Sequence, residues 1–119
     1  MKLNLTLPQR RALVRAIVRL DSASKQELGR RFAHHLGLIP GPRGPDDGID
    51  GYLPVTGGAI IHFQSKLSSV ELDKDDARKY YADIKFHHAS SSVMLAGVGY
   101  KHTFCQRLFG YSCASGRRA

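Results

Sequence analysis

A segment rich in helix- and strand-breaking residues, followed by two short apolar stretches, most constrains the fold of this chain. Residues 38–48 contain three prolines and three glycines, so we expect no regular structure there apart from a short strand at Leu38-Ile39. Residues 49–55 and residues 59–67 are strand candidates, and Thr56-Gly57-Gly58 between them is a turn of hairpin type. The sequence therefore predicts a β-hairpin in the middle of the chain.

The second strand of this hairpin carries polar residues on one of its faces. Because side chains alternate along a strand, Gln64 and Lys66 point to the same side. Asp50 lies 14 positions before Gln64, directly after a glycine-rich turn. If Asp50 sits at the mouth of the neighbouring strand, then a carboxylate, a neutral oxygen and an ammonium converge. Such a set binds Mg²⁺ and polarises a phosphodiester.

Helices are predicted on both sides of the hairpin. Residues 8–20 have an apolar stripe at helical spacing, and Arg11, Arg15 and Arg19 recur every fourth residue on another side. That arginine side either lies along a phosphate backbone or is simply solvated. Residues 25–36 form a second helix, and Ser24 and Glu27 in front of it have capping-box spacing.

The C-terminal half is expected to supply one helix, one strand and a short last helix. Asp73 or Asp75 caps a helix that reaches about His88, with Ala77, Tyr80, Tyr81 and Ile84 on its inner face. Residues 92–100 are mostly apolar, which is typical of a strand buried on both sides. Residues 102–109 form the last helix, and residues 110–119 form a basic tail. This order predicts an α/β domain in which helices flank a mixed sheet.

Charge is distributed unevenly along the chain, whose net charge is +8. Nine basic and two acidic residues lie in residues 1–45, four basic and eight acidic in residues 46–83, and five basic with no acidic in residues 84–119. Basic flanks around an acidic centre suit an enzyme that grips a polyanion and gathers carboxylates where a cation must bind. Nucleic acid is therefore the expected partner, and the alternative is a basic protein that its surface charge keeps soluble.

The stretch Pro45-Asp46-Asp47-Gly48-Ile49-Asp50-Gly51 followed by Phe63-Gln64-Ser65-Lys66 resembles the PD-(D/E)xK nuclease superfamily, most closely its Mrr-like restriction endonuclease branch. The resemblance covers roughly residues 24–100. It implies a restriction-endonuclease-like core of αβββαβ type, here with an extra N-terminal helix. We thus expect one domain over residues 1–119, with an extension at 1–22, a core at 24–109 and the tail at 110–119.

The resemblance also assigns site residues by position. Asp50 matches the metal-binding aspartate and Lys66 matches the catalytic lysine. Gln64 stands where most members have Asp or Glu, a substitution common in the Mrr-like branch. Glu27 fits the place of a further metal ligand, although it is equally the capping acid for Ser24. The implied cofactor is Mg²⁺ or Mn²⁺, with no small-molecule cofactor, and the implied products are a 5′-phosphate and a 3′-hydroxyl.

Two other functions remain open beside a metal-dependent DNA endonuclease: a DNA-binding module of the same fold that does not cleave, and a Holliday-junction resolvase. Double-strand cutting with one small site per chain favours a homodimer. The expected DNA-contacting residues are Arg11, Arg15, Arg19, Arg30, Arg31 and Arg43.

The expected location is the cytoplasm of a prokaryote or a phage-infected cell. The N-terminus lacks the apolar run and cleavage site of a secretion signal, and no window is long and apolar enough to span a membrane. Cys105 and Cys113 are interpreted as incidental thiols in a reducing compartment, since a disulfide between them would close only a short loop.

Overall fold

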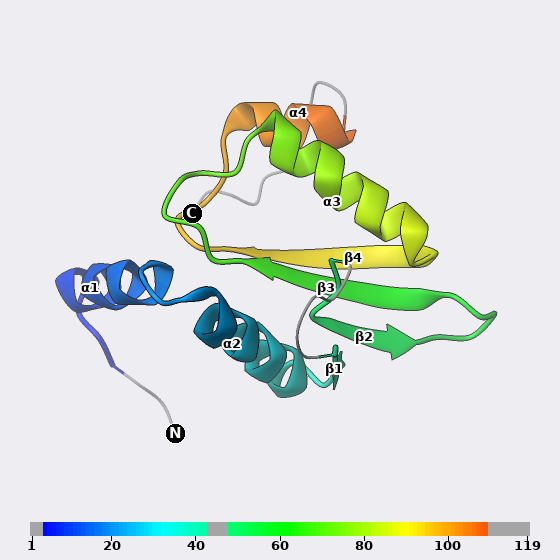
Figure 1. Ribbon diagram of the computed structural model, residues 1–119, viewed down its shortest axis with the longest axis horizontal. Coiled ribbons are helices and arrows are strands. Elements are labelled where there is room, and N and C mark those ends of the chain that lie inside the picture. Colours follow the sequence, from blue (N-terminus) through cyan, green and yellow to red (C-terminus); the bar gives the residue numbers. More distant parts are fainter. Residues whose placement is uncertain (1–3, 43–47, 110–119) are drawn as a thin grey trace.

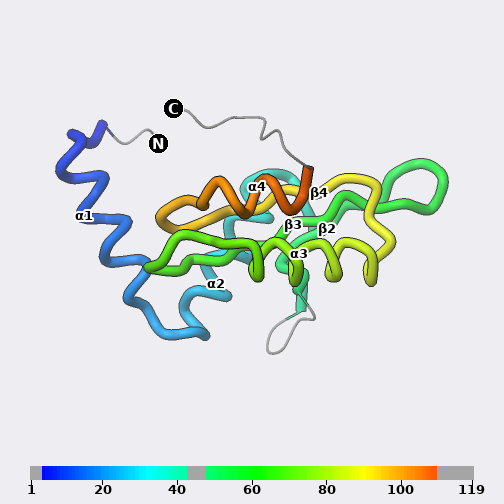
Figure 2. Tube along the Cα trace, turned by 90° about the horizontal axis from the view of Figure 1, so that it is seen from above, coloured from blue at the N-terminus to red at the C-terminus, as the bar shows by residue number. Residues whose placement is uncertain are grey.

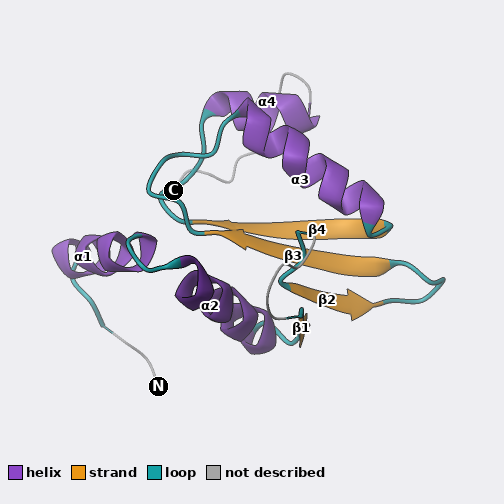
Figure 3. Ribbon diagram, in the orientation of Figure 1, coloured by secondary structure: helices purple, strands orange, loops and turns teal. Residues whose placement is uncertain are grey.

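The protein forms a four-stranded mixed sheet with helices on both faces, as Figure 1 shows for the computed structural model. The structure describes residues 4–42 and 48–109. The strands follow the order β1-β2-β3-β4, in which β1, β2 and β3 are antiparallel neighbours and β4 is parallel to β3. Helix α2 covers one face, and α3 and α4 cover the other (Figure 3). The predicted α/β class with a mixed sheet is confirmed.

Helices α1 (Leu7–Val18) and α2 (Ser22–His35) precede the sheet. Asp21 is the N-cap of α2, because its carboxylate accepts a hydrogen bond of 2.7 Å from the Ser24 backbone N–H. That N–H lowers the pKa of the Asp21 carboxyl, since the bond favours the charged form. The capping box predicted for Ser24 and Glu27 is therefore wrong: the helix begins two residues before Ser24, and both residues lie within it.

The predicted hairpin is present and contains β2 (Gly51–Pro54) and β3 (Ile60–Lys66). Gly51 pairs with Phe63, and the short strand β1 (Ile39–Pro40) pairs with the outer edge of β2. Gly57 and Gly58 have φ angles of +92° and +84°, a region that glycine enters without steric penalty. The turn predicted at residues 56–58 therefore joins β2 to β3, as expected.

Helix α3 (Lys74–Phe86) returns the chain to β4 (Ala89–Ala96), which lies at the edge of the sheet beside β3. Asp73 caps α3 and forms a capping box with Asp76, and the Asp76 backbone N–H lowers the pKa of the Asp73 carboxyl. The strand predicted at residues 92–100 begins earlier and is not buried on both sides. Val93 pairs with Phe63 on the face that carries α2, and it is 49% exposed because α2 packs mainly on β1, β2 and β3.

The main core lies between the sheet and the pair α3 and α4 (His102–Phe109). It contains Leu72, Ala77, Tyr80 and Phe104. Tyr81 was expected to face this core but is 52% exposed. On the opposite face of the sheet, Ala33 of α2 and Phe63 of β3 are buried. Helix α1 lies to one side of these layers (Figure 2), and Val18 is its buried residue.

Two further expectations concern the cysteines and the membrane. Cys105 is buried in α4 and disulfide-bonded, so the expectation of an incidental thiol is wrong for this residue. Cys113 and the predicted basic tail lie outside the described residues.

Within residues 4–42 and 48–109, no helix combines the length and the apolar character needed to cross a bilayer.

Candidate functional site

Asp50 is held in a fixed position at the start of the hairpin, directly before β2. Its side chain is buried, with 6% of the residue exposed. Its backbone N–H donates to the Phe63 carbonyl at 2.8 Å, and its Oδ2 accepts from the Ser65 backbone N–H at 2.7 Å. β2 pairs with β3 only as far as Phe63. Beyond that point, the Asp50 carboxylate takes the place of a backbone carbonyl and accepts the hydrogen bond from the Ser65 N–H. The expectation that Asp50 lies at the mouth of the strand beside Gln64 is met.

Gln64 lies on β3 between the two residues that bond to Asp50. Its Oε1 is buried, and within the described part of the chain it has no hydrogen-bond partner. An unpaired buried carbonyl oxygen is costly, typically about 1–3 kcal/mol. A ligand could satisfy this atom, and an amide oxygen is a donor of the kind that a hard cation takes.

Asp50 and Gln64 both line a pocket of about 220 Å³ between the sheet and the N-terminal half of α2. Its walls come from α2, from the residue before β2 and from the end of β3. The described lining residues are Ser22, Lys25, Gln26, Asp50, Gln64, Ser65 and Leu67. The site is therefore a cleft between a helix and a sheet edge, and not an open strand surface.

Small residues bring α2 this close to the sheet. A Cβ at Gly29 would lie 2.4 Å from Ser65 Oγ and 3.5 Å from the Asp50 carboxyl carbon, and a Cβ at Gly51 would lie 2.4 Å from Ala33 Cβ. Gly29 and Ala33 are one helical turn apart, so they share the face that rests on β2 and β3. Close packing at these positions places the preceding turn, with Lys25 and Gln26, over the pocket.

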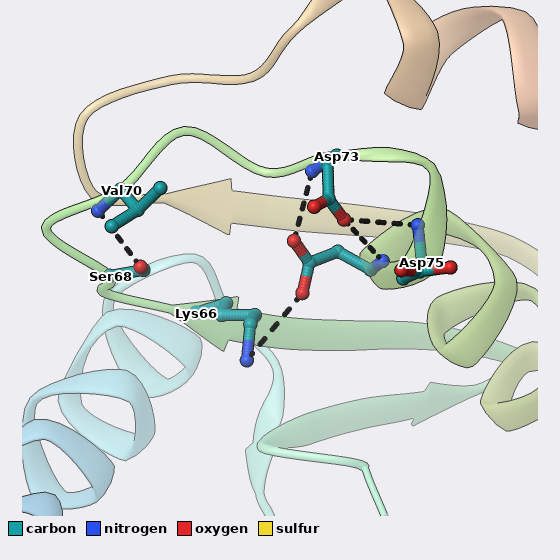
Figure 4. A network of polar contacts seen from close by, with 6 residues as sticks. Lys66, Ser68, Val70, Asp73 and Asp75 are labelled. Atoms are coloured by element: carbon teal, nitrogen blue, oxygen red, sulfur yellow. Dashed lines mark hydrogen bonds and ion pairs between the residues drawn. The ribbon is translucent and has the colours of Figure 1, made fainter.

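Lys66 is the site residue whose surroundings differ most from the expectation. Its Nζ lies 3.8 Å from Asp76 Oδ1, across the end of β3, and its side chain is 47% exposed (Figure 4). Asp76 is also held by the α3 capping box, through Asp73. Lys66 does not line the pocket that Asp50 and Gln64 share. The structure thus brings the first two residues of the predicted set together and directs the third toward α3.

Glu27 lies on α2 but not in this pocket. It forms ion pairs with Arg30 at 3.1 Å and with Arg31 at 3.7 Å. These three residues line a separate pocket with His34 and Pro40. Arg30 also donates from Nε to the Gly41 carbonyl at 2.8 Å, and the Gly41 N–H bonds to the Asp50 carbonyl. Arg30 therefore supports the backbone that carries Asp50.

The other arginines predicted to contact DNA lie on α1, at its end, on α2 or outside the described residues. Arg11, Arg15 and Arg19 are exposed along α1 or at its end, and Arg31 is exposed on α2. Arg43 lies outside the described residues. The exposed guanidinium groups are available to phosphates, but none of these arginines lines the pocket.

A buried histidine beside the site was missed by the sequence analysis. His62 has no solvent-exposed surface, and its ring nitrogens lie 2.7 Å from Ser92 Oγ and 2.7 Å from the Gly48 carbonyl oxygen. Tyr80 joins the network through Ser92, and burial raises the pKa of the Tyr80 hydroxyl. The network ties β3, β4 and α3 to the backbone two residues before Asp50. The partners of His62 come from segments distant in the sequence, so no local pattern indicates this network.

The donor set for a metal is small. Within the described residues, no group of three or more His, Cys, Asp and Glu side chains is arranged to hold an ion. Asp50 supplies one carboxylate and Gln64 one amide oxygen, and both are hard ligands. Mg²⁺ is commonly bound by one or two protein oxygens and keeps several waters. The residues present therefore fit a hydrated Mg²⁺ or Mn²⁺ better than a fully protein-enclosed ion.

Comparison with known proteins gives no further guidance: no family model matches the chain, and no curated protein or solved structure is similar to it at a significant level.

Proposed function

We propose that the protein is a metal-dependent DNA endonuclease with a restriction-endonuclease-like core. The observation that carries the proposal is that buried Asp50 lines the same pocket as Gln64, whose buried Oε1 has no partner among the described residues. The order α2-β1-β2-β3-α3-β4 supports it, because the αβββαβ arrangement expected from the resemblance has the same order. The antiparallel β1-β2-β3 unit with a parallel β4 agrees with it as well.

In this proposal Asp50 and Gln64 hold Mg²⁺ or Mn²⁺ at the pocket wall. The bound cation would lower the pKa of a coordinated water and neutralise charge on the scissile phosphate. Asp50 is kept in place by the Ser65 N–H and Gly41 N–H. Gln64 gains a partner for its buried oxygen. The proposed substrate is a DNA phosphodiester, and the proposed products are a 5′-phosphate and a 3′-hydroxyl.

Lys66 is proposed to reach the phosphate when its contact with Asp76 opens. That ion pair is long and half-exposed, at 3.8 Å and with 47% of the lysine side chain exposed. Exposed pairs of this kind contribute only about 0–1 kcal/mol, so its opening is inexpensive. Glu27 lies in a different pocket, and we propose that it orients Arg30 and Arg31 and does not hold the metal directly.

The rest of the DNA contact is assigned to exposed arginines. Arg11, Arg15, Arg19 and Arg31 are proposed to bind phosphates, which position the duplex without reading its sequence. Two copies of the chain are proposed to act together, because one small site cuts one strand at a time.

The test of this proposal is cleavage of supercoiled plasmid by the purified protein. We expect nicked and linear DNA with Mg²⁺ or Mn²⁺ and none after addition of EDTA. We also expect ends that DNA ligase rejoins without prior phosphorylation. EDTA-resistant cleavage, or ends that ligase cannot rejoin, would contradict the metal-dependent mechanism.

A non-cleaving DNA-binding module is the second candidate, and the position of Lys66 favours it. The contact between Lys66 and Asp76 leaves the motif's ammonium outside the pocket. Duplex binding in the absence of any cleavage with either metal would support this candidate. Preference for a four-way junction over a linear duplex of the same sequence would instead identify a junction resolvase.

A further inference from the structure

The pocket is also lined by a lysine that is not part of the sequence motif. Lys25 of α2 lines the cleft together with Ser22 and Gln26, and its side chain is half-buried. Among the described lining residues it is the one with a positive charge. Within residues 4–42 and 48–109, its ammonium forms no hydrogen bond or ion pair.

Helical spacing explains why Lys25 faces the site. It lies four residues before Gly29, and residues at i and i+4 share a helix face. Gly29 is the position at which α2 touches Ser65 and Asp50 most closely. The same face therefore carries the contact with the sheet and, one turn earlier, the lysine over the pocket.

Lys25 and Lys66 differ in whether an acidic side chain already lies close to the ammonium group. Lys66 has Asp76 at 3.8 Å, on the α3 side of β3. Asp76 is itself fixed, because its Oδ2 accepts a hydrogen bond of 2.9 Å from the Asp73 backbone N–H. Lys25 has no such partner in the described structure, so a phosphate oxygen in the pocket would meet an ammonium that needs no displacement.

We infer that Lys25 binds the phosphate that enters the pocket, and that it supplies there the positive charge which the motif assigns to Lys66. The ligand class is a phosphodiester oxygen of a nucleic-acid backbone. An ammonium suits this role as a compact charge with three donors, and charge-assisted hydrogen bonds to phosphate are about twice as strong as neutral ones. The inference rests on the proposed function for the identity of the pocket, but phosphate contact does not require cleavage.

The first experiment therefore measures binding without metal. Fluorescence anisotropy of a labelled linear duplex in EDTA is recorded between about 50 and 200 mM salt for the wild type and for Lys25→Ala, Lys25→Arg, Lys66→Ala and Lys79→Ala. Lys79 is an exposed lysine of α3 away from the pocket, so it controls for general loss of charge. Melting curves confirm that each variant is folded.

Loss of one phosphate contact makes the slope of log K against log salt shallower by about 0.9. We expect this change for Lys25→Ala and wild-type slopes for Lys25→Arg and Lys79→Ala. A slope for Lys25→Ala equal to that of Lys79→Ala would overturn the inference.

The second experiment measures single-turnover cleavage in Mg²⁺, with the protein in saturating excess over the DNA. We expect a fall of roughly 100-fold for Lys25→Ala, the size expected when a preorganised donor to a reacting oxygen is removed. Lys25→Arg should keep most of the rate. Full activity in Lys25→Ala together with loss of activity in Lys66→Ala would show that Lys66, and not Lys25, supplies the positive charge to the phosphate. The endonuclease proposal would still hold. If neither the wild type nor any variant cleaves, the endonuclease proposal fails. The salt slopes then still decide whether Lys25 contacts phosphate.

Discussion

Asp50→Asn is expected to reduce plasmid cleavage by about 100-fold or more while the protein stays folded. Removing the charge leaves the metal with two neutral oxygens, and even indirect changes around a metal site reduce affinity or activity by about 10–100-fold. The amide keeps an acceptor oxygen for the Ser65 N–H, which now bonds to Asp50 Oδ2 at 2.7 Å. The measurement is the initial rate of plasmid nicking in Mg²⁺, with a melting curve as the check on folding.

A matched control for this substitution is Asp75→Asn. Asp75 is an exposed acid on α3 whose Oδ1 pairs with Arg78 at 3.1 Å, and it does not line the pocket. We expect this variant to cleave at the wild-type rate. Equal rates for Asp50→Asn and Asp75→Asn would show that the pocket is not the site of cleavage.

Gly51→Ala is expected to destabilise the protein by about 1–3 kcal/mol, the usual effect of forcing a methyl into a tight contact. Its Cβ would lie 2.4 Å from Ala33 Cβ, an atom that cannot rotate away because it is fixed to the α2 backbone. Gly51 is not among the glycines with positive φ, so steric contact and not backbone strain is the cause. Urea denaturation followed by circular dichroism gives the free energy of unfolding.

The double variant Gly51→Ala with Ala33→Gly tests the same contact from the other side. Ala33→Gly alone weakens α2 by about 1 kcal/mol through helix propensity. It also removes the methyl that meets the new Cβ. We expect the double variant to be more stable than the sum of the two single effects predicts, with a coupling energy within the range of about 0.5–3 kcal/mol found for contacting residues. Additive effects would contradict close packing of α2 on β2.

Local signals in the sequence predicted the elements well. The Thr56-Gly57-Gly58 turn located the hairpin, and the last helix occupies residues 102–109 as expected. These features depend on backbone preferences of a few adjacent residues. The cap of α2 was misplaced because Asp21 and Ser24 are both good N-cap residues. The structure selects Asp21, which starts the helix two residues before Ser24.

The candidate site could be predicted only in part. The hairpin placed Asp50 and Gln64 at one pocket, because their relative position depends on the register of two adjacent strands. The pairing of Lys66 with Asp76 and the approach of Lys25 could not be read from the sequence. They depend on where α3 and α2 pack against the sheet, which is set by contacts between distant residues.

The central claim is that Asp50 and Gln64 together hold a divalent cation, and Mn²⁺ binding followed by electron paramagnetic resonance tests it most directly. Free Mn²⁺ gives a sharp signal that disappears on binding, so a titration yields the dissociation constant without DNA. The account predicts saturable binding to the wild type and at least about 10-fold weaker binding to both Asp50→Asn and Gln64→Ala. Equal binding by the wild type and both variants would contradict it.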